Sequence, residues 1–215
     1  MITKVLTDYQ RSKFDSEDDS IFYAKPRFVN HLDESFRRRL TDLYREEINS
    51  NSVVLDLMSS WISHLPDEIK YKRVIGHGLN LEELKINKRL DSYWVQDVNK
   101  NQNLPLEDNS VDVCLIVAAW QYLQYPEKLA FELKRVVRFQ GKLIISFSNR
   151  AFWAKSPRIW TDGTDMDRIN YIKNVLNSQG WHLIEHITEE TRKEEILSFI
   201  KGKGDPYFSI LASNS

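Results

Sequence analysis

The chain has 215 residues, 41% of them hydrophobic and 12% aromatic, which is enough for one sizeable core and short for two. Thirty basic and thirty-one acidic side chains leave a formal net charge of −1, so charge gives no argument for nucleic acid or an anionic membrane as a partner. The single cysteine, Cys114, lies in an apolar run, which excludes a disulfide framework and a thiolate-rich metal site.

These bounds predict one domain over residues 1–215, with an N-terminal arm and helical cap over 1–50 and a core over 51–215. The sequence has no long uninterrupted apolar segment and no basic-then-apolar pattern at its start. We therefore expect a cytoplasmic protein that does not bind membranes.

The first thirty residues divide into two stretches. Residues 1–20 are polar and rich in acids, which predicts a loosely held arm. Residues 21–29 carry Phe22, Tyr23 and Phe28 around Pro26, an extended piece that must pack on something. It either covers a hydrophobic face of the domain or forms a lid over a pocket.

An amphipathic helix is predicted next, with Asn30 as its N-cap, because apolar residues recur at helical spacing. These residues are Leu32, Phe36, Leu40, Leu43, Tyr44 and Ile48. The run that ends at Leu57 then has too little polar alternation for a half-exposed strand, so it predicts a strand buried on both faces of a parallel sheet. After it, Ser63 is expected to cap a short helix with Pro66 in its first turn.

Alternating strand and helix patterns fill the rest of the chain. Strands are predicted over 72–78, 93–99, 111–119, 142–146, 181–187 and 207–212. Helices are predicted over 81–85, 126–137 and 166–176, and a charged helical excursion over 189–200. A tight turn at Gly141 is expected between the second of these helices and the strand that follows it.

Three stretches resemble the class I S-adenosylmethionine-dependent methyltransferases of the type 11 kind. They are Leu55-Asp56-Leu57 at the end of the first strand, residues 104–113 leading into the fourth strand, and residues 132–146 leading into the fifth. The resemblance implies an α/β, Rossmann-like, seven-stranded, mostly parallel sheet with an antiparallel last strand and helices on both faces. It also implies S-adenosyl-L-methionine as cofactor.

The resemblance assigns cofactor contacts to strand ends and to the loop after the first strand. These residues are Asp56, Met58, Ser59, Ser60, Asn80, Asp97, Val98 and Trp120. Asp97 matches the acid that accepts a hydrogen bond from the adenine amino group, although an ordinary turn residue would also fit there. Trp120 either stacks on adenine or fills the groove between strand and helix.

Two positions depart from the family pattern. Met58-Ser59-Ser60-Trp61 replaces the glycine-rich loop, which restricts close approach of the backbone to a cofactor. Gly78 stands where the family has an acid for the ribose hydroxyls. Asn80 is a nearby polar substitute, or it simply caps the helix after it.

Candidate acceptor contacts follow the fifth strand and the aromatic stretch before residue 30. They are Phe22, Arg27, Asn149 and Arg150, with Arg158 as an alternative cation for an acceptor carboxylate or phosphate. Asn149 and Arg150 could equally tie their loop to the sheet. Candidate bases are His31, Tyr23 and Tyr122, with His64 as a further possibility.

The first functional hypothesis is methyl transfer to a small-molecule acceptor, with no nucleic acid, membrane or metal involved. The rival is a binding or regulatory protein of the same fold with lost or altered cofactor use, suggested by the missing glycines and by Gly78. A nicotinamide-dependent dehydrogenase is set aside because the sequence lacks a GxGxxG turn, and no metal-ligand spacing, nucleophile elbow or phosphate loop occurs.

Overall fold

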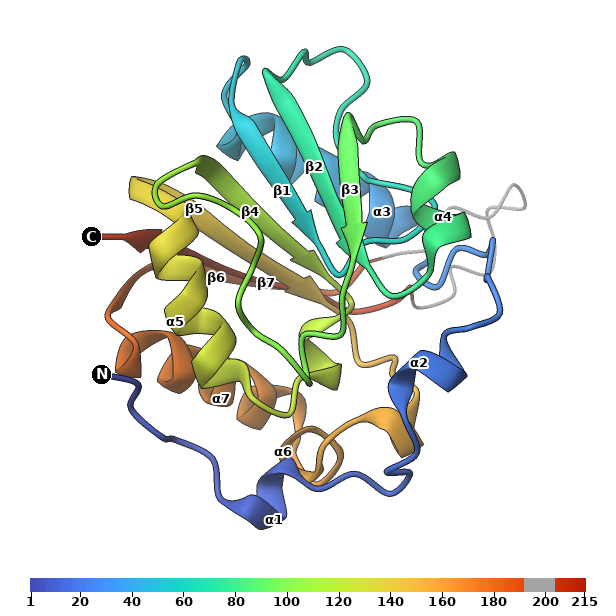
Figure 1. Ribbon diagram of the computed structural model, residues 1–215, viewed down its shortest axis with the longest axis vertical. Coiled ribbons are helices and arrows are strands. Elements are labelled where there is room, and N and C mark those ends of the chain that lie inside the picture. Colours follow the sequence, from blue (N-terminus) through green and yellow to red (C-terminus); the bar gives the residue numbers. More distant parts are fainter. Residues whose placement is uncertain (192–203) are drawn as a thin grey trace.

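The computed structural model describes residues 1–191 and 204–215, which form a seven-stranded sheet flanked by helices (Figure 1). The strands are β1 (Val53–Leu57), β2 (Arg73–Gly78), β3 (Ser92–Val95), β4 (Val111–Val117), β5 (Val137–Phe147), β6 (Trp181–Glu189) and β7 (Tyr207–Asn214). Their order across the sheet is β3-β2-β1-β4-β5-β7-β6. The expected charged excursion over 189–200 lies mostly outside the described residues.

The first five strands are mutually parallel, and β7 runs antiparallel to both β5 and β6. This confirms the predicted Rossmann-like sheet with an antiparallel last strand. The chain order reverses between β1 and β4, where successive connections leave in opposite directions. At such a switch point the carboxyl ends of the strands leave a crevice for a ligand.

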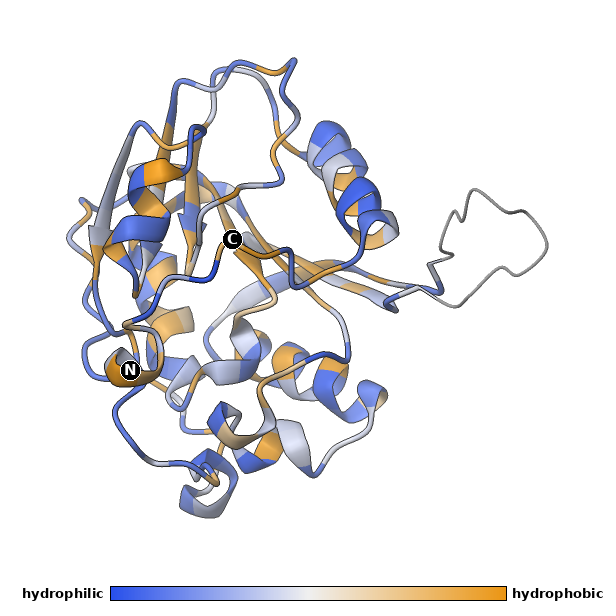
Figure 2. Ribbon diagram, turned by 90° about the vertical axis from the view of Figure 1, so that its right-hand side faces the viewer, coloured by the Kyte–Doolittle hydropathy of each residue, from blue (hydrophilic) through white to orange (hydrophobic). Residues whose placement is uncertain are grey.

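Helices cover both faces of the sheet because side chains of a strand alternate between its faces. Val54 and Ile144 belong to one core cluster with α3 (Glu34–Glu47), whereas Leu55 and Ile145 belong to a second cluster with α5 (Pro126–Val136) and α7 (Asp165–Ser178). In Figure 2 the strands and the helices beside them carry both blue and orange residues. Cys114 is fully buried as a free thiol, as predicted.

Two predicted helix starts and one predicted turn were wrong. The N-cap of α3 is Asp33, whose carboxylate accepts from the Phe36 amide at 2.8 Å, and Asn30 lies before it in the pocket wall. No helix forms around Pro66, because the Ser63 hydroxyl donates to Asp56 instead of capping a helix. No separate turn precedes β5, which begins directly after α5 and is bulged near Gln140 (φ +63°).

The predicted loose arm over residues 1–20 is also wrong, because this segment is tied down at both ends. Arg11 forms a bidentate ion pair with Glu127, with N–O distances of 2.6 and 2.9 Å. Lys155 is 1% exposed and binds Asp15 at 2.9 Å, and Lys13 binds Asp19 at 2.6 Å. The arm carries the short helices α1 (Asp8–Arg11) and α2 (Asp19–Phe22), and it runs past the short α6 (Arg158–Thr161) in Figure 1.

In the described part of the chain, no helix is both long and apolar enough to cross a membrane.

Candidate functional site

A cavity of about 660 Å³ lies at the carboxyl ends of β1, β2, β3 and β4. Its lining includes Asp56 near the end of β1 and Met58 after it, and Asp97 and Val98 after β3. Tyr23, Arg27 and residues 29–32 form part of its wall, so the aromatic stretch before α3 lies over a pocket, which is the lid alternative. The volume falls within the range of small-molecule sites, roughly 300–1,000 Å³.

The loop after β1 is fastened to β2 by His77. Its Nδ1 accepts from the Met58 amide at 3.1 Å, its Nε2–H donates to the Gln96 carbonyl at 2.9 Å, and the Ser59 amide donates to the His77 carbonyl at 2.6 Å. Burial lowers the pKa of His77 to about 4, so the ring stays neutral with one nitrogen free to accept. Met58 adopts a left-handed conformation (φ +58°) that a glycine would take at lower cost.

Gly78 faces this loop at very short range. A Cβ atom built on Gly78 would lie 2.5 Å from the Ser59 carbonyl oxygen and 3.3 Å from the Leu84 side chain. The backbone that replaces the glycine-rich loop therefore occupies the space where a side chain at position 78 would start. This packing explains why the family acid is absent here.

We expect Gly78→Ala to lower the free energy of unfolding by about 2–3 kcal/mol, because the new Cβ meets backbone that His77 holds in place. Gly76→Ala in the same strand is the matched control, since its Cβ meets only the Leu90 side chain, which can swing away. Urea unfolding of both variants checks the order. Equal losses, or a larger loss for Gly76→Ala, would contradict this account of Gly78.

Asp56 is 6% exposed at the base of the loop, where one of its carboxylate oxygens accepts from the Ser59 and Ser63 hydroxyls. Burial raises the pKa of Asp56, and the two hydroxyls partly oppose that shift. Ser60 donates instead to Glu83 on α4 (Leu81–Ile86) at 2.6 Å. The serines are thus bonded to two acids that themselves line the cavity.

Asn80 caps α4, which was one of the two readings of this residue. Its side-chain oxygen accepts from the Glu82 and Glu83 amides, and its amide nitrogen donates to the Tyr23 and Ala24 carbonyls. All of its polar atoms are therefore engaged, and it also anchors the segment that covers the pocket. A ribose contact by Asn80 stays a prediction that would require these bonds to break.

The remaining cofactor candidates divide between the pocket and the core. Asp97 lines the pocket, and one of its oxygens accepts from the Asn99 amide at 2.8 Å. Val98 is buried and lines the pocket as well. Trp120 does not: it is 1% exposed, and its indole N–H donates to the Tyr171 hydroxyl on α7, so the prediction that it stacks on adenine was wrong.

The candidate bases all face the pocket. Burial raises the pKa of Tyr122 to about 12 and raises that of Tyr23 further, so both phenols are protonated at neutral pH. Burial, followed by the charge of Arg27, lowers the pKa of His31. Burial also lowers the pKa of His64 to about 4. The histidines are therefore neutral and can accept a proton. The tyrosines keep theirs, although the Tyr122 hydroxyl oxygen accepts a hydrogen bond from the Phe152 amide at 3.1 Å.

The acceptor candidates lie at the far side of the pocket or just outside it. Asn149 and Arg150 line it, and Arg150 pairs with Asp205, as the loop-tying alternative requires. Phe22 does not line the pocket, but its ring lies 4.4 Å from the Arg27 guanidinium. Arg158 is outside, stacked 3.5 Å above Phe14 near the N-terminal arm, so it is not an acceptor contact.

Several lining residues were left out of the predicted site, and three of them are polar side chains with defined partners. Glu83 accepts from the Arg27 amide at 2.7 Å, Gln121 donates to the Arg150 carbonyl, and Arg37 donates to the Leu32 carbonyl. Arg37 and Glu83 sit in helical patterns where a polar side chain usually points to solvent, so no local signal marked them. Within the described residues, no group of three or more His, Cys, Asp and Glu side chains could hold a metal ion.

Comparison with known proteins agrees with this geometry. Residues 51–145 match the family model described as a methyltransferase domain. No curated protein sequence matches the chain. The strand order, the crevice and this match together define a Rossmann-like methyltransferase fold.

Solved structures show the same fold at low identity. A chain from the complex of the Haloferax volcanii Trm112 methyltransferase activator with a methyltransferase is 18% identical, with a TM-score of 0.59 over 83% of this chain and 89% of that one. An Aquifex aeolicus S-adenosylmethionine-dependent methyltransferase is 16% identical, with a TM-score of 0.57 over 92% and 97%. The [4+2]-cyclase SpnF is 14% identical, with a TM-score of 0.59 over 87% and 88%. All three share the fold of this chain.

Proposed function

We propose that this protein binds S-adenosylmethionine in the cavity at the β1–β4 switch point and transfers its methyl group to a small-molecule acceptor. The observation that carries the proposal is the open cavity beside Asp56 and Asp97 at the family's cofactor positions. Neither Met58 nor Trp61 closes it. Met58 packs against the larger core cluster, and the Trp61 indole N–H donates to the Val29 carbonyl.

The residues present fit the two ends of the cofactor better than its middle. Asp97 keeps one carboxylate oxygen uncommitted to backbone for the adenine amino group, and Val98 offers an apolar wall for the ring. The Ser59 and Ser60 loop lies beside the place for the amino-acid end. The ribose has no carboxylate at position 78, so its hydroxyls must find other partners.

When bound, the cofactor supplies an activated methyl group on a sulfonium, which leaves the protein to align the acceptor and exclude water. Residues 27–32 cover the cavity, and aromatic side chains line its far side. Tyr23 and Tyr122 hold their protons at neutral pH and so orient an acceptor as donors. His31, being neutral, is the candidate to accept a proton from a hydroxyl or amine.

Asp97→Asn is expected to weaken binding of S-adenosylhomocysteine by about tenfold or more. The asparagine side-chain oxygen can still accept from the Asn99 amide. Its NH2 group then faces the adenine amino group, where a hydrogen-bond acceptor is needed. Isothermal titration calorimetry measures the change. Asp8→Asn on the surface is the matched control and should bind as the wild type does.

A binding or regulatory role is the second candidate, and it is favoured by the closed position at Gly78. The [4+2]-cyclase with this fold is a protein whose name describes a different reaction from methyl transfer. Two results separate the candidates. Transfer of a deuterated methyl group from labelled S-adenosylmethionine to any product excludes a role limited to binding. The methyltransferase proposal fails if saturating S-adenosylhomocysteine gives no heat in calorimetry and no shift in melting temperature.

A further inference from the structure

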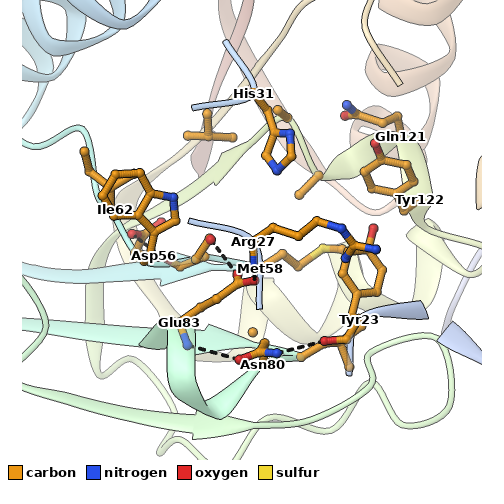
Figure 3. A pocket seen from close by; sticks show the side chains of 18 of the residues that line it. Tyr23, Arg27, His31, Asp56, Met58, Ile62, Asn80, Glu83, Gln121 and Tyr122 are labelled. Carbon is orange, nitrogen blue, oxygen red and sulfur yellow. Dashed lines mark hydrogen bonds between the residues drawn. The ribbon is translucent and has the colours of Figure 1, made fainter. Parts of the chain in front are cut away.

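Arg27 lies across the pocket, and its guanidinium group is only partly hydrogen-bonded. Its amide is bonded to Glu83 on one side, and its side chain extends toward Tyr23 and Tyr122 on the other (Figure 3). Nη2 donates to the Phe22 carbonyl at 2.9 Å, but Nη1 is buried without a hydrogen-bond partner. No carboxylate within residues 1–191 and 204–215 forms an ion pair with it. Buried N–H donors normally have a hydrogen-bond acceptor, and a bound ligand can supply one to Nη1.

Of the acids that line the pocket, Asp19, Asp56 and Glu83 already have other partners. Both oxygens of Glu83 are used, by the Arg27 amide and by Ser60. Asp56 is held by two serine hydroxyls, and Asp19 is paired with lysines. A sulfonium cofactor would add a second positive charge beside Arg27. An anionic acceptor between the two cations would be attracted by both.

Aromatic rings surround the Arg27 guanidinium. The rings of Phe22, Tyr23 and Phe152 lie 4.4, 5.6 and 5.7 Å from it. Tyr122 stacks on Phe152 with ring centroids 6.1 Å apart and planes at 28°. This wall favours a flat apolar group next to the charge.

We propose that the methyl acceptor is an aromatic carboxylic acid whose carboxylate is held by Arg27. The inference rests on the proposed function and narrows it. A carboxylate oxygen attacks the methyl carbon, the new O–C bond forms as the C–S bond breaks, and the bonding pair leaves on sulfur to give the thioether. The product is a neutral methyl ester, and no proton needs a base.

This acceptor agrees with the protonation states at the site. The phenols of Tyr23 and Tyr122 keep their protons and cannot act as bases at neutral pH. An acceptor that is already ionised does not need them in that role. They can instead donate hydrogen bonds to the carboxylate.

The test uses the full-length protein saturated with S-adenosylhomocysteine and titrated with benzoate, cinnamate and indole-3-acetate, with benzamide and acetate as comparison probes. At least one aromatic acid should bind ten times or more tightly than benzamide and acetate. Arg27→Gln should weaken that binding tenfold or more and leave the affinity for S-adenosylhomocysteine within twofold. Arg27→Lys should lose less, because it keeps the charge without the planar fork.

Arg158→Gln is the matched control, since Arg158 is an arginine over an aromatic ring outside the pocket, and its acid binding should equal the wild type's. Binding of the amide as tightly as the acid, or of no acid at all, overturns the proposal. So does a loss of S-adenosylhomocysteine affinity in Arg27→Gln, which would assign Arg27 to the cofactor. Failure of the wild type to bind S-adenosylhomocysteine instead counts against the proposed function itself.

Discussion

Glu127→Gln should lower the free energy of unfolding by about 3–5 kcal/mol, the usual cost of removing one partner of a buried ion pair. Glu127 is 2% exposed and accepts from the Arg11 guanidinium and from the Val5 and Leu6 amides. Burial alone would raise the pKa of Glu127, but Arg11 and these amides outweigh it and lower the pKa. Glutamine removes the charge and leaves the Arg11 guanidinium buried without a counter-ion.

Urea unfolding measures this loss, and hydrogen exchange shows where it acts. The amides of Val5 and Leu6 should lose protection first, because they bond directly to the Glu127 carboxylate. Asp8→Asn serves as control, since the exposed Lys4–Asp8 pair should contribute less than about 1 kcal/mol. An unchanged urea midpoint for Glu127→Gln would show that the arm contributes nothing to stability.

Acidification from pH 7 to about pH 4 should remove roughly 3 kcal/mol of stability for each of His64 and His77. Burial depresses the pKa of both rings to about 4, against 6.5 for an ordinary imidazole. Between these values the unfolded chain binds protons that the folded chain does not. The stabilisation is therefore complete above pH 6.5 and is lost as pH falls toward 4.

Urea midpoints at half-unit pH steps check this dependence. His64→Gln should remove about half of the histidine contribution to the pH slope, because its side chain cannot titrate and that of His77 still can. His77 is left intact because its ring also fastens the Met58 loop. A slope in His64→Gln that equals the wild type's would contradict the buried neutral state of His64.

The sheet was predictable because its signals are local. Apolar runs over 53–57 and 111–117 can be read as buried strands from composition alone, and the passages leading into β4 and β5 matched a known family. The antiparallel last strand followed from that resemblance. Helix α7 was predicted over 166–176 and forms as Asp165–Ser178.

The N-terminal arm was not predictable, because its contacts join residues far apart in sequence. Arg11 and Glu127 are 116 positions apart, and Glu127 reads as an ordinary acid in the first turn of a helix. Lys155 reads as a loop lysine, yet it is almost fully buried among arm residues. Pairings of this kind depend on tertiary packing and leave no periodic signal.

The candidate site was predictable by position but not by partner. Asp56, Met58 and Asp97 lie at the cavity, where the family pattern put them. Trp120 lies in the core instead, where its indole N–H donates to the Tyr171 hydroxyl on α7. The role of Gly78 could not be deduced from sequence, since it depends on how closely the Ser59 carbonyl passes over β2.

The position of β7 also governs how the molecule is made. This strand lies between β5 and β6, and among the described residues β6 pairs with no other strand. While the ribosome is still adding residues 207–214, β6 therefore has no neighbour to bond to, and β5 presents an open apolar edge. Completion of the sheet has to wait for β7, and until this strand emerges the nascent chain is most exposed to wrong association.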